Sequence, residues 1–166
     1  SSGTDALLAA LMAAGVGGAR PLEPQRRRSR ARRKARRTRA MVEGSSQRYA
    51  RLSSKYMGDA EALLGRGDFV QASEKFWGAV AEATKAAAAE RRWRHSSHHD
   101  LRRAISRLYQ ETGDAALVRL FGIAESLHAN FYEDFMEAAD VRVCAEDARR
   151  IVEKLHRGNG RDAERG

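Results

Sequence analysis

Residues 67–90 read GDFVQASEKFWGAVAEATKAAAAE, and this stretch decides the fold class. Its apolar and small residues recur at three- and four-residue steps, which is the spacing of one face of an α-helix. They are Phe69, Ala72, Phe76, Val80, Ala83 and Ala87. Asp68 precedes the first of them and Gln71 follows it three residues later, the pattern of a capping box at a helix start. We therefore expect a helix from residue 68 to about residue 92 with one buried face.

The same helix chemistry continues through residues 41–166. That segment contains no proline, and Ala, Leu, Glu and Arg dominate it, which favours helices over strands. Periodic apolar residues predict further helices over about residues 45–64, 97–112, 114–135 and 139–156. Because the connections are short, neighbouring helices should run antiparallel. The sequence therefore predicts an all-α fold, an antiparallel bundle of four to five helices.

Residues 1–40 differ in composition from the rest of the chain. They hold eleven Arg and Lys against two acidic residues, whereas residues 41–166 hold twenty of each, so the net charge of +9 belongs to residues 1–40. A block of like charges repels itself, and we expect a low-complexity basic tail that is disordered or a solvated helix. Such a tail can neutralise phosphates as a nucleic-acid-binding arm. The alternative is that Met41 is the true start, the tail is no part of the natural product, and residues 41–166 are the protein.

Composition also limits the cellular compartment in which the protein can work and the kinds of active site that it can contain. A single cysteine, Cys144, excludes an internal disulfide framework and fits a reducing cytosol. No apolar run is long enough to span a membrane, so we expect a cytoplasmic protein without a membrane partner. Asn and Gln are scarce and charged residues abundant, a bias typical of thermophile proteins. No Gly-rich phosphate loop, paired-carboxylate site or serine nucleophile motif is present, and we expect no cofactor.

The densest polar cluster is the segment 93–100, which reads WRHSSHHD. RNA cleavage without a metal needs a base for the 2′-hydroxyl proton and a cation for the phosphorane, and His and Arg supply both near neutral pH. Arg94, His95 and His98 are therefore candidate catalytic residues. The alternative is that the serine and aspartate of residues 97–100 cap a helix and the histidines are exposed around them. A metal site is the weakest interpretation, because the histidines lack the one-turn spacing that presents two ligands together.

A fourth candidate catalytic residue, His128, lies on the apolar stripe of a later predicted helix. It is either a core histidine with a hydrogen-bond partner or part of a cleft shared with His98. The cleft exists only if the two segments meet in space. Trp77 is expected in the core, because aromatic residues at helical spacing are normally buried. The candidates for contacting a nucleic acid or nucleotide are Lys85, Trp93, Asn130 and Tyr132.

Three segments resemble the archaeal PaREP-type proteins. They are residues 56–90, residues 93–101 (WRHSSHHDL) and residues 124–135 (AESLHANFYEDF). The resemblance covers about residues 45–157 and none of the tail. The PaREP-type family is similar to the HEPN domains, which are bundles of four or five helices, usually dimeric. Many HEPN domains act as metal-independent RNases or accompany nucleotidyltransferases in toxin–antitoxin and defence systems. The resemblance therefore implies a HEPN-like bundle that forms a homodimer.

The resemblance also implies where an active site would lie. Active HEPN RNases carry an arginine and, after four to six intervening residues, a histidine near the start of a late helix. Arg119 and His128 are on the late helix here, but eight residues separate them, which departs from the pattern. Arg94 and His99 have the spacing, with four residues between them, and so do Arg92 and His98, with five. Both pairs lie around the start of the third predicted helix, however, and not on the late helix.

Two hypotheses about function follow. The first is a helical module that acts through self-association or a partner protein and has no catalysis of its own. The second is a metal-independent ribonuclease or a nucleotide-binding toxin, with RNA or a nucleotide as its ligand. We favour the first because the arginine–histidine spacing fails where the family would have its site.

Overall fold

The computed structural model describes residues 23–163, with side chains for residues 25–158. These residues form five helices and no strand, which confirms the all-α prediction. The helices are α2 (Glu23–Gly65), α3 (Phe69–Glu90), α4 (His98–Thr112), α5 (Ala116–Glu133) and α6 (Ala138–Ala163). The chain divides into two units between Arg39 and Ala40, and each unit is described by itself. The prediction that residues 41–166 are a domain of their own stays a prediction.

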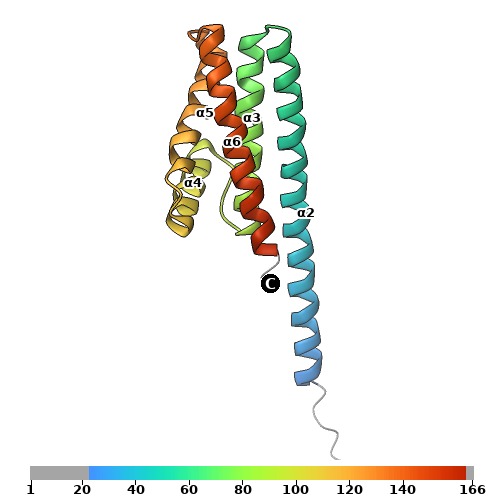
Figure 1. Ribbon diagram of the computed structural model, residues 1–166. Coiled ribbons are helices and arrows are strands. Elements are labelled where there is room, and N and C mark those ends of the chain that lie inside the picture. The colour runs from blue at the N-terminus through green and yellow to red at the C-terminus, as the bar shows by residue number, and fades with distance from the viewer. Residues whose placement is uncertain (1–22, 164–166) are drawn as a thin grey trace, which may run out of the picture. The chain divides into compact units, whose positions relative to one another are not determined.

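Helix α3 is the centre of the bundle. It packs against α4, α5 and α6, and α5 also packs against α6 (Figure 1). Two serines on the part of α2 that follows residue 40 bond to backbone oxygens of α3. Ser46 Oγ donates to the carbonyl of Ala86 at 3.2 Å, and Ser53 Oγ donates to the carbonyl of Ala79 at 2.7 Å. Because the later serine meets the earlier alanine, α2 and α3 run antiparallel, as predicted.

Small side chains on α3 let its neighbours approach closely. Most of its alanines are buried, and so are Phe76 and Val80, which fill the space between the helices. Gly78 lets the Tyr56 ring of α2 pack closely against α3, because a Cβ atom at this position would lie 3.1 Å from that ring. An alanine-rich helix with a few large side chains can therefore be buried on several sides at once.

The helix ends follow the local signals in the sequence. Asp68 caps α3 by accepting the backbone N–H of Gln71, and Ser97 with Asp100 forms a complete capping box at the start of α4. Gly113 ends α4 with a φ of 72°, a left-handed conformation that glycine adopts without strain. The cap at Asp68 was predicted and is confirmed, although Gln71 contributes only its backbone N–H and no complete capping box forms there. Of the two interpretations of residues 97–100, the helix cap is confirmed.

The structure corrects two boundaries. The first helix was predicted from residue 45, but α2 begins at Glu23, because Arg, Ala, Lys and Gln are good helix formers and Pro24 is tolerated in a first turn. Of the two expectations for the tail, the solvated helix therefore applies from Glu23 on, and residues 1–22 lie outside the described residues. Helix α5 ends at Glu133, before Phe135, which is exposed and does not extend the buried stripe. In residues 23–163, no helix combines the length and apolar character needed to cross a membrane.

Asn130 is a buried polar residue that joins two helices and a turn. Its Nδ2 donates to Ser73 Oγ on α3 at 3.0 Å. Its Oδ1 accepts the backbone N–H groups of Phe135 at 2.9 Å and Met136 at 2.7 Å, so it satisfies the chain where α5 ends. A buried amide with all these partners stabilises one arrangement of the α5–α6 connection.

Replacing Asn130 with alanine should destabilise the protein. The change leaves two backbone N–H groups and one serine hydroxyl without their buried partner, which should lower the free energy of unfolding by about 2–3 kcal/mol. Urea denaturation followed by circular dichroism measures the change. Gln110→Ala removes an exposed amide from α4 and serves as the control. Equal effects of the two substitutions would contradict the structural role of Asn130.

Candidate functional site

Trp77 of α3 brings together the two histidines that the sequence singled out. The indole is buried, and the His98 ring stacks on it at 5.0 Å between centroids, with the planes 21° apart. The His128 ring stacks on the same indole at 5.2 Å and 30°. The two imidazole centroids are 6.3 Å apart, so the two segments do meet in space. We call Trp77, His98 and His128 the imidazole cluster.

A carboxylate holds each imidazole. His98 Nε2 donates to Glu125 Oε1 at 2.5 Å, and His128 Nδ1 donates to Glu74 Oε2 at 2.8 Å. Arg102 also binds Glu125, through two guanidinium hydrogen bonds, one of them at 2.6 Å. A carboxylate on one ring nitrogen orients the ring and determines which nitrogen carries the proton. Each carboxylate thus engages one ring nitrogen of its histidine.

The groups around Glu125 lower the pKa of its carboxyl. Burial would raise the pKa of the Glu125 carboxyl, since its side chain is only 15% exposed. The hydrogen bonds and positive charges of Arg102 and His98 outweigh burial and hold the pKa below its ordinary value of 4.5. Glu125 is therefore ionised in the folded protein at neutral pH and ties α5 to α4.

Tyr132 and Asn130 lie on different sides of α5. Tyr132 is 71% exposed, and its ring meets the edge of His128 at 5.2 Å, so it extends the imidazole cluster toward solvent. Asn130 is fully buried, with its amide engaged as described above. Of these two candidates for ligand contact, Tyr132 alone is accessible.

The candidates His95 and Lys85 meet at another place, around Tyr49 of α2. His95 Nδ1 lies 2.7 Å from the carbonyl oxygen of Trp93, and its ring meets Tyr49 edge-on at 5.3 Å. Lys85 Nζ bonds to Glu82 at 2.6 Å and lies over the Tyr49 ring at 5.9 Å. His95 is thus oriented toward α2, whereas His98 is oriented toward α3 and α5.

Trp93 and Arg94 lie at a third place, a small polar hollow that Arg103 and Arg107 of α4 also line. Arg107 lies over the Trp93 ring at 5.3 Å. Asp100 also lines this hollow, and burial would raise its pKa, but hydrogen bonds from Ser96 and Ser97 outweigh burial and hold it low. Asp100 is the cap of α4. In the described residues, no three His, Cys, Asp or Glu side chains gather in a way that could hold a metal ion.

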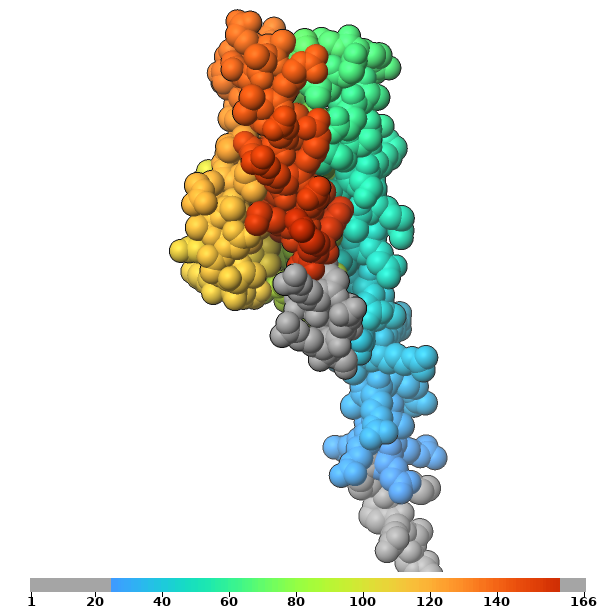
Figure 2. Space-filling model, viewed as in Figure 1, coloured from blue at the N-terminus to red at the C-terminus, as the bar shows by residue number. Residues whose placement is uncertain are grey.

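A shallow groove continues from the imidazole cluster along α4 and α5. Its lining residues are Arg102, Ile105, Ser106, Val118 and Phe121. Phe121 connects the groove to the cluster, because its ring meets Trp77 edge-on at 5.5 Å. Val118 is 46% exposed, and Tyr109, one turn along α4 from Ile105, is also exposed. We call this surface the α4–α5 face; helices α4 and α5 form one side of the bundle in Figure 2.

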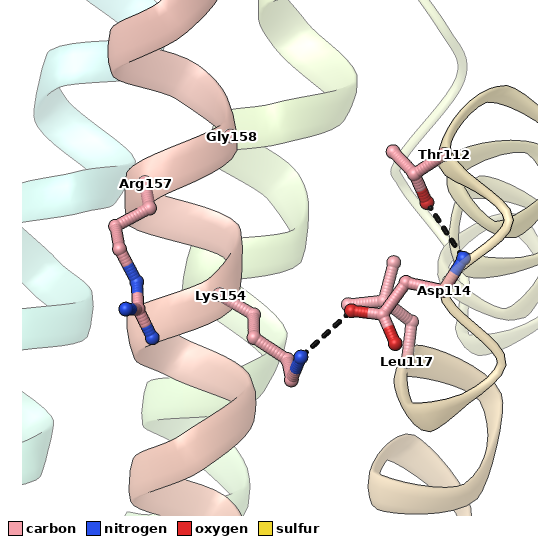
Figure 3. A pocket seen from close by; sticks show the side chains of 6 residues that line it. All are labelled: Thr112, Asp114, Leu117, Lys154, Arg157 and Gly158. Atoms are coloured by element: carbon pink, nitrogen blue, oxygen red, sulfur yellow. Dashed lines mark hydrogen bonds and ion pairs between the residues drawn. The ribbon is translucent and has the colours of Figure 1, made fainter.

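Another hollow lies where the α4–α5 turn meets the end of α6 (Figure 3). Lys154 Nζ bonds to Asp114 Oδ2 at 2.7 Å across it. This bond lowers the pKa of Asp114 despite its partial burial. Asp114 also accepts the backbone N–H of Ala116, although the capping position of α5 is Ala115. The pair joins α6 to the turn, so we interpret this hollow as structural.

The groups around the imidazole cluster were not identified from the sequence. Glu74, Glu125 and Arg102 all lie three or four residues from a cluster member on the same helix, before Trp77, before His128 and after His98. That spacing is a signal, because residues three and four apart share a helix face. Charged residues with this spacing occur at many positions in a helical protein. Only the packing of α3, α4 and α5 brings Glu74, Glu125 and Arg102 to the imidazole cluster.

The chain is similar to one protein family and to a solved structure. The family model described as the archaeal PaREP1/PaREP8 family matches residues 48–152. A crystal structure of a protein from Sulfolobus solfataricus is similar, with 26% sequence identity and a TM-score of 0.58. That likeness covers 63% of this chain and 93% of the Sulfolobus chain. No curated protein sequence matches.

Glu125→Gln should destabilise the protein in a pH-dependent way. A carboxyl whose pKa is lowered on folding stabilises the folded state above its ordinary value of 4.5, and loses that contribution as the pH falls through the lowered value. At neutral pH we expect Glu125→Gln to cost about 1–2 kcal/mol. The difference from the wild type should shrink as the pH drops below 4.5.

Urea denaturation at neutral pH and at steps below pH 4.5 measures this difference. Glu133→Gln, at an exposed position of the same helix, is the control. A stability difference that does not change with pH would show that the charge of Glu125 has no part in holding α4 on α5.

Proposed function

We propose that this chain, which belongs to the archaeal PaREP1/PaREP8 family, is a helical interaction module that associates with a second copy of itself through the α4–α5 face. The family match covers residues 48–152, which include this whole face. The observation that carries the proposal is the groove between α4 and α5, with exposed apolar side chains at its rim. We further propose that the module works in the cytoplasm, where its one cysteine, half-buried Cys144, stays reduced.

The groove has the anatomy of a helix-packing surface. Its apolar lining includes the buried Ile105 and Phe121 and the exposed Val118. Tyr109, one turn from Ile105 on α4, is exposed as well. Exposed apolar side chains that adjoin a groove are typical of a protein–protein contact. An arriving apolar side chain would exclude water from a floor that is already free of charge.

Gly122 adds to this interpretation. It lies one turn after Val118 on α5, and a Cβ atom there would meet nothing within 4 Å. Glycine inside a helix costs about 1 kcal/mol relative to alanine, and this position has neither a positive φ nor a tight neighbour to require it. Close approach of a helix from another chain is a physical reason for a small residue at this point.

The charges of the α4–α5 face are compatible with binding a second copy of the same face. Arg102 and Glu125, with 61% and 15% of their side chains exposed, give one end of the groove both signs of charge. In a two-fold contact the same patch meets itself, and a patch with both signs can complement its own image. The resemblance to HEPN domains implies a dimer as well, and the HEPN relationship stays a prediction.

Val118→Arg should abolish self-association if the α4–α5 face is the interface. Two-fold symmetry would bring the two new arginines together in an apolar groove, and we expect the dissociation constant to rise by about a hundredfold or more. Sedimentation velocity of the full chain over a range of concentrations measures it.

The matched control is Val143→Arg, the same change at an exposed valine of α6. It should leave association unchanged. A wild-type chain that stays monomeric, or a Val143→Arg variant that dissociates as readily as Val118→Arg, would reject the interface.

A second candidate function is cleavage of RNA without a metal, and the imidazole cluster favours it. Two imidazoles 6.3 Å apart, each oriented by a carboxylate, can act on one phosphodiester, one as base toward the 2′-hydroxyl and one as acid toward the leaving oxygen. His98 is exposed and next to Arg102, which can balance phosphate charge if it leaves Glu125. The two glutamates oppose this function, because they repel a phosphate.

For this second function we expect the full chain to cleave single-stranded RNA in EDTA, with a bell-shaped pH profile. The double variant His98→Ala/His128→Ala should lose at least about a hundredfold in rate. Gln110→Ala, at an exposed position of α4, is the control and should stay active. Absence of cleavage by the folded wild type would reject the ribonuclease and leave self-association as the function.

A further inference from the structure

The first unit of the chain carries the strongest charge of the molecule. Between residues 26 and 39, ten of fourteen residues are Arg or Lys and none is acidic. This segment is helical, as part of α2, and all ten basic side chains are exposed. The self-association proposed above makes no use of it.

Helical spacing arranges these cations in rows. One row has steps of four, three and four residues, and a second row follows the opposite side of the segment. The first row is Arg26, Arg30, Arg33 and Arg37, and the second contains Arg28, Arg32 and Arg36. Arg27 and Lys34 flank the first row. A narrow strip of small residues, Ala31, Ala35 and Thr38, separates these cations from the second row. A helix with two rows of cations is better matched to a ligand with two rows of phosphates than to a ligand with a single negative charge.

The like charges of this segment are unfavourable in isolation. Cations three and four residues apart on a helix repel each other, and the two hydroxyl groups of the segment bond to its own backbone instead. Ser29 Oγ donates to the carbonyl of Arg26 at 2.9 Å, and Thr38 Oγ1 donates to the carbonyl of Lys34 at 3.0 Å. A polyanion that neutralises the rows would therefore stabilise the helix as well as bind it.

The chemistry of the segment selects among polyanions. An anionic membrane surface requires an apolar face that inserts, and alanine is the largest apolar residue between positions 26 and 39. The major groove of B-DNA is about 12 Å wide and admits a helix of about 10–12 Å diameter. The major groove of an RNA duplex is too narrow and deep for this. Fourteen residues of helix span about 21 Å, or roughly six base pairs.

We infer that residues 26–39 bind double-stranded DNA as a helix in the major groove, with the two cationic rows on the phosphates of the two strands. The contacts are to the backbone, so binding is independent of sequence and depends strongly on salt. None of residues 26–39 belongs to the α4–α5 face or to the imidazole cluster, so this inference does not depend on self-association.

Fluorescence anisotropy of a mixed-sequence DNA duplex, titrated with the full chain at several salt concentrations, tests this inference. The logarithm of the binding constant should fall with the logarithm of salt, with a slope of about −0.9 for each phosphate neutralised. Replacing the four arginines of the first row with glutamine should weaken binding by about tenfold or more and reduce the slope by about one for each arginine. Glutamine is a good helix former, so circular dichroism should be unchanged.

Two matched variants separate this site from bulk charge. The first replaces four exposed arginines of the bundle with glutamine and so changes the net charge equally; they are Arg51, Arg66, Arg103 and Arg150. It should bind nearly as well as the wild type. The second replaces the first row with lysine and should keep the salt slope.

Three results would overturn the inference. The first is no DNA binding by the full chain at low salt. The second is an equal loss of DNA affinity in the row variant and in the bundle variant, since total charge alone would then explain the binding. The third is an RNA duplex bound as tightly as DNA. The helix would then not be binding in a major groove, because the major groove of RNA is too narrow to admit it.

Discussion

The burial of α3 on several sides at once is the constraint on which this bundle depends. Helices α4, α5 and α6 and the later part of α2 all use α3 as their common surface. Alanine at most of its buried positions lets them approach, while Phe76 fills the space that remains. Every other element therefore takes its position from α3, including those that carry the imidazole cluster.

Trp77 extends that core to the surface. It is buried among the helices, yet two histidine rings stack on its indole and are themselves partly exposed. A large aromatic surface at the edge of a core can orient polar rings without hydrogen bonds of its own. The carboxylates of Glu74 and Glu125 complete the orientation. The cluster is thus an extension of the core packing, and the α4–α5 face begins where it ends.

Ion pairs hold the outer helices on this core. Arg149 of α6 pairs with Glu61 of α2, and Lys154 of α6 pairs with Asp114 in the turn before α5. These side chains are about one-third exposed, so each pair contributes modestly to stability, but together they specify how α6 lies against both neighbours. The bundle itself has balanced charge, and the excess of the chain lies in residues 1–40. Packing and net charge therefore belong to different parts of the molecule.

The sequence by itself determined that the chain is helical, where most helices begin and end, and which faces are buried, because these depend on residues within one or two turns of each other. The start of α2 at Glu23 and the end of α5 at Glu133 are the exceptions. Asp68, Ser97 and Gly113 act where the local pattern put them. The tertiary structure decided what the polar residues do, because that depends on which helices cross. His98 and His128 are thirty residues apart in the chain and share one indole, whereas His95, three residues from His98, turns to Tyr49. Asn130, expected at a ligand, is buried instead, since its partners come from another helix and from the turn after its own.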